Sequence, residues 1–250
     1  MNTMNENGIL ASKFINNKNI LFRKLESAEK WDKVSCICLE KIYTVENIPQ
    51  INYLWYDLQL KKNDSLDEDF LNSENVFSEM DPTFKNMTKS AILGIDQNDH
   101  LIGTSLSMTF NFFVGYSDLN SMTSKYQISP DEDSIISFNS VRKFSGIVRK
   151  NLDDNRYFVS VIGASEIMLP KCSKYMFNGV EKDIDDNFLQ ALNSAFEKLS
   201  HSQRVLLIAS MERDSSPENG WINELEGKNL TFIGLVAFQY NSRYLDFNLI

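Results

Sequence analysis

The sequence predicts an α/β chain (α+β mixed), with a central mixed, mostly antiparallel sheet flanked by helices. Short apolar runs of strand length recur through its second half, and residues 205–209 are apolar on both faces of a strand. Apolar residues with helical spacing precede that run, from Phe188 to Leu199. A strand–helix–strand crossover normally makes its two strands parallel, whereas hairpins are antiparallel, so we expect one mixed sheet with helices packed on it.

The first half of the chain is expected to contain an extension, a strand, a helix and a hairpin. Residues 1–33 are interpreted as an N-terminal extension and residues 34–250 as one domain with an insertion at about 115–155. Within that domain, residues 34–42 predict a strand. A helix should begin after Thr44, because Ile51, Leu54 and Leu58 fall three and four residues apart. Two β-rich runs, 91–95 and 101–108, flank an Asn- and Asp-rich turn and predict a hairpin.

The second half shows a denser series of strands. We expect strands over 135–138, 144–148 and 157–162, the last continuing through 166–169. A polar loop should follow at 170–182, and then a helix that begins near Asp183 or Asp185. Strand 205–209, a short helix at 217–226 and a closing hairpin of 230–238 with 243–249 complete the expected order.

Composition excludes several classes of protein. Hydrophobic residues make up 42% of the 250 residues, which is typical of a globular chain, and the net charge of −9 argues against a nucleic-acid binder with a basic surface. Three cysteines and two histidines barely assemble a zinc site, so we expect no metal and reduced thiols. With neither a secretory signal nor a long apolar run in view, we expect no membrane span and a cytoplasmic protein.

The order of elements from residue 34 onward, and the ending from Leu225 to Gly234 (LEGKNLTFIG), carry a resemblance to a known family. They resemble the GCN5-related N-acetyltransferase (GNAT) superfamily, of which this chain would be a divergent member. In that family two neighbouring strands diverge and acyl-CoA lies in the opening, with its pyrophosphate on backbone amides before a helix. Here the resemblance assigns those parts to residues 159–169, 171–181 and 205–209. The ending departs from the family pattern Tyr-x-x-x-Gly-Phe-x-x-x-Gly at Leu225, Asn229 and Leu230.

The resemblance implies an acyltransferase that moves an acetyl or longer acyl group to a small-molecule or peptide amine. The donor would be acetyl-CoA, another acyl-CoA or an acyl carrier protein. Glu166 would act as the general base. Tyr244 (or Tyr240) would act as the general acid, because Leu225 occupies the position of the family's usual tyrosine. The residues assigned to the co-substrate are Met168, Leu169, Lys171, Lys174, Asn178 and Gly179.

Two alternatives remain open beside this hypothesis. The loop around Gly179 lacks the family's leading Arg or Gln, and Glu181, Asp183 and Asp185 crowd the following helix start, where they would satisfy its N–H donors. The chain would then be a catalytically inactive GNAT-like module that binds another protein, with a basic partner surface favoured by its negative charge. The other alternative is an unrelated mixed α/β protein that shares the order of elements by chance.

Overall fold

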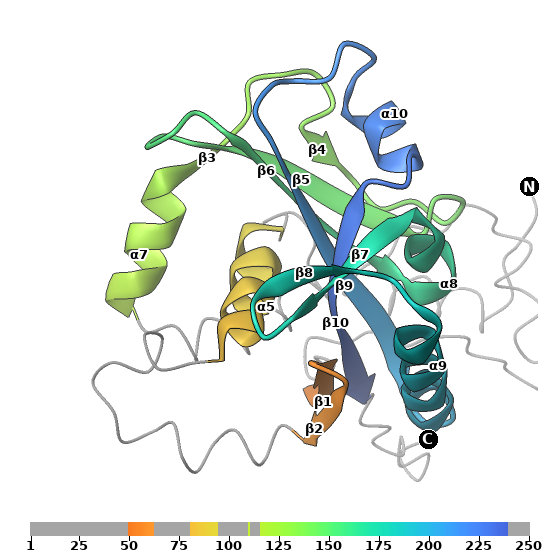
Figure 1. The fold of residues 1–250 in the computed structure, drawn as a ribbon. Helices are drawn as coiled ribbons and strands as arrows, with labels where there is room; N and C mark the ends of the chain where they lie inside the picture. Colours follow the sequence, from red (N-terminus) through yellow and green to blue (C-terminus); the bar gives the residue numbers. More distant parts are fainter. Residues whose placement is uncertain (1–49, 63–80, 95–109, 111–115, 240–250) are drawn as a thin grey trace, which may run out of the picture. The chain divides into compact units, whose positions relative to one another are not determined.

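The structure is a computed structural model, and it describes residues 50–62, 81–94, 110 and 116–239 (Figure 1). Its strands are β1 (Gln50–Tyr56), β2 (Gln59–Lys62), β3 (Tyr126–Ile128), β4 (Ile135–Ile136), β5 (Phe144–Asn151), β6 (Tyr157–Ala164), β7 (Cys172–Phe177), β8 (Val180–Asp183), β9 (Arg204–Arg213) and β10 (Leu230–Gln239). Its helices are α5 (Pro82–Leu93), α7 (Tyr116–Lys125), α8 (Ser165–Met168), α9 (Asp186–Ser200) and α10 (Trp221–Glu226), and a 3-10 turn, η2 (Leu169–Lys171), follows α8.

These ten strands form one sheet. Its main path runs β2-β1-β10-β9-β6-β5-β3, with β4 beside β5 and the β7–β8 hairpin beside β10. Among the strands that the structure describes, β7 and β10 are the one parallel pair, and every other pair is antiparallel. Helices cover both faces of this sheet (Figure 1). The prediction of a mixed, mostly antiparallel sheet flanked by helices is therefore confirmed.

The sheet carries a hydrophobic core on each face. In β6 the side chains alternate: Phe158 and Ile162 join the core under α5, whereas Val159 and Val161 join the core under α8, α9 and α10. Burying apolar surface on both faces stabilises the domain by about 25 cal/mol per Å² removed from water. It also explains why the central strands are apolar almost throughout rather than alternating with polar residues.

Helix α9 confirms the helix expected near Asp185. The Asp185 carboxylate accepts a hydrogen bond from the Phe188 N–H at 2.7 Å and so caps the first turn. Phe188, Leu192 and Leu199 are buried, which matches their helical spacing in the sequence. The capped, amphipathic helix therefore covers the sheet face that carries Val159 and Val161.

Two segments of the first half differ from expectation. Residues 50–56 form strand β1, not a helix, because Trp55 packs in one core while Leu54 and Tyr56 pack in the other. Residues 91–93 form the last turn of α5, not a strand, and Pro82 occupies the first turn of that helix, where its missing N–H costs nothing. In both segments the spacing of the apolar residues is typical of the other kind of element: helical spacing in strand β1, and a consecutive apolar run in the last turn of helix α5.

The opening that an acetyltransferase needs is absent. Strands β6 and β9 pair antiparallel without interruption, from Tyr157 opposite Arg213 to Ala164 opposite Leu206. The chain leaves the sheet after Ala164, where α8 takes the place of the expected strand continuation. A loop was expected over 170–182, but residues 172–183 form the β7–β8 hairpin, which lies between β6 and α9 in the chain. The path into β9 is therefore not a simple crossover.

Several expectations concern residues outside the described ranges. They are the extension at 1–33, the strand at 34–42, the turn and second strand of the hairpin at 96–108, and the last strand at 243–249. The division into an extension, a domain and an insertion at about 115–155 stays a prediction. Within the described ranges, no helix combines the length and the apolar composition needed to cross a membrane.

Candidate functional site at one end of the sheet

Three central strands meet at one end of the sheet. Strand β5 begins opposite the last residues of β6, with Phe144 paired to Gly163, and β6 ends opposite the first residues of β9, with Ala164 paired to Leu206. The turn before β5 and the start of α8 therefore lie beside each other. We call this region, residues 138–144 together with 163–171, the sheet end.

The turn before β5 is tightly organised. The Asn139 carbonyl accepts a hydrogen bond from the Lys143 N–H at 2.7 Å, and the Asn139 side-chain oxygen accepts from the N–H groups of Val141 at 3.1 Å and Arg142 at 2.6 Å. Lys143 has a φ of 57°, a left-handed conformation that costs a residue with a Cβ about 1–3 kcal/mol. Just before the turn, the Phe138 side chain is 50% exposed. The turn thus holds a strained lysine close in sequence to an exposed aromatic ring.

Gly163 fastens this turn to β6. A Cβ at position 163 would lie 2.4 Å from the Phe144 Cβ and 2.8 Å from the Lys143 carbonyl oxygen, closer than real Cβ contacts allow. The next residue, Ala164, donates its N–H to that same carbonyl at 3.0 Å. Only glycine permits this close approach, so the position of Lys143 is fixed relative to α8.

Glu166, which the sequence suggested as a general base, lies in the first turn of α8 rather than on a strand. One of its carboxylate oxygens is 3.4 Å from the Lys143 ammonium, and both side chains are about half exposed. Such a solvated ion pair contributes little to stability, about 0–1 kcal/mol. Met168, assigned to the co-substrate, is fully buried in the core, and Leu169 packs against that core.

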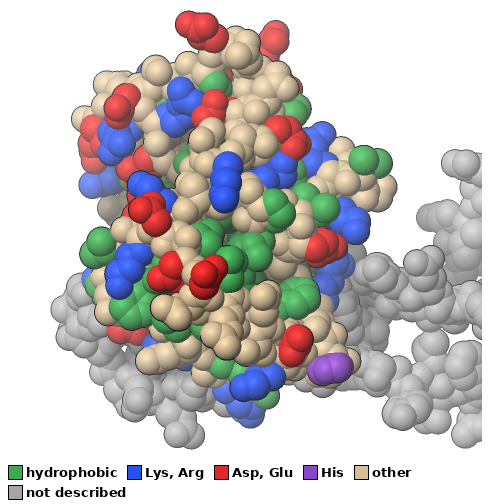
Figure 2. All heavy atoms as spheres, turned by 45° about the vertical axis from the view of Figure 1, so that its right-hand side comes forward, with side chains coloured by type: hydrophobic (Ala, Val, Ile, Leu, Met, Phe, Trp, Pro, Cys, Tyr) green, Lys and Arg blue, Asp and Glu red, His purple; other side chains and the backbone are tan. Residues whose placement is uncertain are grey.

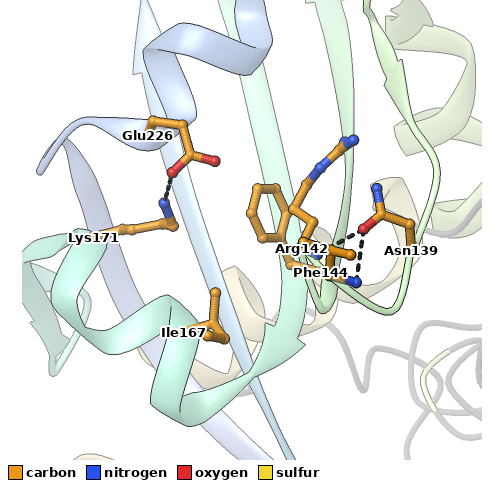
Figure 3. Close-up of a pocket in the computed structure, with 7 residues that line it drawn as sticks. Asn139, Arg142, Phe144, Ile167, Lys171 and Glu226 are labelled. Atoms are coloured by element: carbon orange, nitrogen blue, oxygen red, sulfur yellow. Dashed lines mark hydrogen bonds and ion pairs between the residues drawn. The ribbon is translucent and has the colours of Figure 1, made fainter.

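A pocket of about 380 Å³ opens at the sheet end on the side of α8 and α10, a volume at the lower end of the range for small-molecule sites. Figure 3 shows Lys171 and Glu226 on one side of it, the Phe144 ring and Arg142 on the other, and Ile167 between them. The Lys171 ammonium forms an ion pair with the Glu226 carboxylate. The remaining residues that line the pocket are Asn139 and Val141.

Figure 2 turns the side of α8, α9 and α10 toward the reader. Hydrophobic side chains gather near the centre of this face, and basic and acidic side chains are interspersed around them. A mixed surface of this kind lacks the single-sign field that steers a polyanion over long distances. Recognition of an anion on this face therefore depends on cations placed at short range.

Three other residues assigned to the co-substrate lie on the β7–β8 hairpin, away from that pocket. The Lys174 ammonium is 2.9 Å from Glu181, and this hydrogen bond raises the pKa of Lys174 above its usual value. The Asn178 N–H donates to the Asp57 carboxylate at 2.8 Å, and the Gly179 N–H donates to the Thr83 hydroxyl at 2.9 Å. The backbone donors expected to hold a phosphate are therefore already bonded within the protein.

The structure brings Glu166 and Lys171 to the sheet end and places Lys174, Asn178 and Gly179 elsewhere, while Tyr244 lies outside the described residues. Sequence reasoning missed Phe138, Asn139, Arg142, Lys143 and Glu226. A usable signal was present in the polar segment with two adjacent cations between two strand-like runs, at 139–143. Within the described ranges, no group of three or more His, Cys, Asp or Glu side chains could hold a metal ion.

Cys172 is buried behind η2 and is expected to be unreactive. Desolvation raises the pKa of its thiol to about 12, with Lys228 opposing the shift only in part. Alkylation by iodoacetamide at pH 8.5, followed by peptide mass spectrometry, should leave Cys172 unmodified in the folded protein and modify it in urea. Because the folded pKa is the higher one, the stability that this thiol contributes should be lost as pH rises from about 9 to 12. Rapid modification in the folded state would contradict this expectation.

Comparison with known proteins decides the family. The family model described as "P-type ATPase, cytoplasmic domain N" matches residues 86–243, which is more than half of the chain and includes most of α5 and all strands from β3 to β10. The chain belongs to this family. Its membership overturns the acetyltransferase resemblance.

Several curated relatives of this chain are subunits of cation-transporting ATPases. Potassium-transporting ATPase alpha chain 2 of Oryctolagus cuniculus is 28% identical over 248 residues, covering 91% of this chain and 22% of the relative. Sodium/potassium-transporting ATPase alpha subunits of Hydra vulgaris and Drosophila melanogaster are 26% and 24% identical, each covering 91% of this chain and 24% of the relative. The chain therefore spans about a quarter of the length of the relatives that it matches.

These findings correct the expectations that rested on the acetyltransferase family. An acyltransferase activity, an inactive GNAT-like module, acetyl-CoA or another acyl-CoA as co-substrate, an acyl carrier protein and an amine acceptor are all wrong for a P-type ATPase domain N. The physical reason is the uninterrupted pairing of β6 with β9, which leaves no space for a pantetheine arm between them.

Proposed function

We propose that this chain is a nucleotide-binding domain and that it binds ATP at the sheet end. Family membership supports the ligand, because the chain matches a cytoplasmic domain of the P-type ATPases and an ATPase must bind ATP. The observation that carries the location is the turn at 139–143, where a strained Lys143 lies five residues after Phe138, whose ring is half exposed. The proposal assigns the base to Phe138 and the phosphates to Lys143.

Phe138 suits a base because its side chain is half exposed in a chain whose other large aromatic rings at this end are buried. Phe144, at the other end of the same turn, is only 1% exposed. Stacking of a base on an exposed aromatic ring contributes about 1–3 kcal/mol. That range is sufficient to select an adenine nucleotide over free phosphate.

Lys143 suits the phosphates because its present partner is weak. The Lys143–Glu166 pair is solvated, so a phosphate group that carries more charge than a carboxylate can replace Glu166 at little cost. The left-handed backbone fixes the point from which this flexible side chain reaches out. The phosphate contact is therefore expected to depend on salt, as exposed charge contacts do.

The wider role of the chain follows from its relatives. Their names describe transport of potassium, or of sodium and potassium, by ATPases. We propose that this chain supplies the nucleotide site to cation transport of that kind and that it is cytoplasmic, in keeping with the family name, cytoplasmic domain N.

Calorimetric titration of the full chain with ATP tests the site. Phe138→Ala should weaken the binding of ATP by about 1–3 kcal/mol, which corresponds to a Kd about 5- to 150-fold higher. Lys143→Gln should weaken the binding of ATP more than the binding of adenosine, because this substitution removes a phosphate contact and leaves the stacking surface intact.

Two matched controls are available at the opposite end of the β5–β6 hairpin. Leu152→Ala removes a side chain that is also 50% exposed, and Lys125→Gln removes a half-exposed lysine that pairs with Asp153 at 3.3 Å. Neither control should change the affinity for ATP by more than about twofold. The proposal fails if Phe138→Ala and Leu152→Ala bind ATP equally well, or if the wild-type chain does not bind it.

A further inference from the structure

We infer that the pocket beside Lys171 and Glu226 is a second site, which takes a small phosphate-bearing ligand. Its lining includes neither Phe138 nor Lys143, the two residues proposed to bind the nucleotide, but it does include Asn139, Val141 and Arg142 of the same turn, so the two sites would be neighbours with different ligand-binding side chains. The pocket lies on the sheet face that carries α8 and α10, because Phe144 and Ile167 belong to the core of that face.

Two cations reach the pocket from separate elements. The Arg142 guanidinium carbon and the Lys171 ammonium each lie 5.7 Å from the centre of the Phe144 ring. Contact with the face of an aromatic ring within about 6 Å is favourable for a cation and restricts where it can lie. Figure 3 shows the Phe144 ring between the two cations, with Lys171 on the side of Glu226 and Arg142 on the other side, and all of these residues line the pocket.

Lys171 is the better placed of the two cations. Its side chain is 13% exposed, so its ammonium has lost much of its water and needs an anionic partner. The partner in this structure is Glu226, whose side chain is 55% exposed at the end of α10. Rotation of Glu226 into water is therefore much cheaper than leaving Lys171 unpaired, and an incoming anion can take the carboxylate's place.

The exchange favours a phosphate over other anions. Without Glu226, Arg142 and Lys171 present two positive charges, which match a phosphate monoester of charge about −1.5 to −2 at pH 7. A guanidinium binds phosphate through two parallel N–H···O bonds, and an ammonium adds a third donor from another direction. The apolar Ile167 and Phe144 lower the local dielectric and strengthen these contacts, and the volume of about 380 Å³ leaves room for a small organic group.

The test is to titrate the full chain with inorganic phosphate, and separately with glycerol 3-phosphate, at constant ionic strength. Binding is monitored by the NMR chemical shifts of the backbone amides. Shifts should concentrate in residues 139–144 and 167–172. Arg142→Gln and Lys171→Gln should each raise the Kd for phosphate at least tenfold. Glu226→Gln should lower that Kd about three- to tenfold, because this substitution removes the carboxylate that competes with phosphate for Lys171. Thermal unfolding of each variant shows whether it remains folded, and Glu226→Gln keeps both cations in place.

Matched controls separate a built site from general charge effects. Asp214→Asn removes one negative charge, and Arg156→Gln one positive charge, from an ion pair at the far end of β6 and β9. The inference is overturned if Asp214→Asn tightens phosphate as much as Glu226→Gln does, or if Arg142→Gln and Lys171→Gln leave Kd unchanged. It is also overturned if Lys143→Gln abolishes the phosphate shifts, since phosphate would then occupy the nucleotide site. Tighter binding of succinate than of either phosphate would contradict the choice of ligand.

Discussion

Replacement of Trp221 by alanine is expected to lower the free energy of unfolding by about 3–5 kcal/mol, the range for deleting a large buried aromatic side chain. Trp221 has the largest side chain among the fully buried residues that the structure describes. Its ring lies 5.2 Å from that of Tyr157, and it belongs to the core under α8, α9 and α10. The loss includes both the transfer free energy of the ring and the cavity that it would leave.

The indole N–H adds a polar contribution that a second variant can isolate. It donates to the Asp131 carboxylate at 3.2 Å. Burial acts to raise the pKa of Asp131, but hydrogen bonds from Ser216, Trp221 and Ser129 outweigh it, and the pKa lies below its usual value. The stability from this carboxylate is therefore present above the unfolded pKa of about 4 and is lost as pH falls through the lower, folded pKa.

Urea unfolding followed by far-UV circular dichroism measures both variants, because it does not depend on tryptophan fluorescence. Trp221→Phe keeps most of the ring and loses the N–H, so it should cost less than Trp221→Ala, and its difference from wild type should shrink below pH 4. A loss of under 1 kcal/mol for Trp221→Ala would contradict the packing described for α10. A pH-independent cost for Trp221→Phe would contradict the role of the Asp131 hydrogen bond.

Secondary structure was predictable where local pattern and long-range packing agree. Strands β5, β6, β9 and β10 are apolar runs bounded by polar residues, and α9 shows both a cap at Asp185 and a helical apolar stripe. Strand β1 was misassigned because the sheet is covered on both faces, which removes the alternation that distinguishes a strand. Its apolar residues then fall by chance at helical spacing.

The β7–β8 hairpin shows a different kind of error, in which a family pattern displaced a local signal. Asn178-Gly179 is among the strongest two-residue hairpin sequences, and both residues have positive φ here, at 49° and 76°. Alignment of Gly179 with a phosphate-binding loop hid this signal. With this hairpin between them, β6 and β9 do not flank the simple strand–helix crossover on which the acetyltransferase resemblance depended.

The candidate sites could not be predicted from local pattern at all. The pocket joins residue 142 before β5, residue 171 after α8 and residue 226 at the end of α10, and no periodicity links positions so far apart. Their proximity follows from the antiparallel order β9-β6-β5, which is a property of the whole sheet. Lys171 was named from the sequence for the wrong ligand, and its partner Glu226 was not named.

Gly163→Ala is expected to lower the free energy of unfolding by about 3 kcal/mol, which is the upper end of the range for overpacked cores. It is also expected to weaken the binding of ATP at least tenfold. The new methyl group would meet the Phe144 Cα and the Lys143 carbonyl oxygen at 2.8 Å, and backbone atoms cannot move aside as a flexible side chain can. Relief of the clash requires β5 to shift away from β6. That shift would carry Lys143 and the whole 139–143 turn with it.

Gly146→Ala is the matched control, because Gly146 also lies on β5, where a new Cβ would come no closer than 3.3 Å to its neighbours. It should cost under about 1.5 kcal/mol and leave ATP affinity within about threefold of wild type. Urea unfolding and calorimetric titration of the two variants give both quantities. Equal effects of the two substitutions would show that the close approach at Gly163 does not set the position of the turn. Loss of stability with unchanged ATP affinity would show that the nucleotide does not contact this turn.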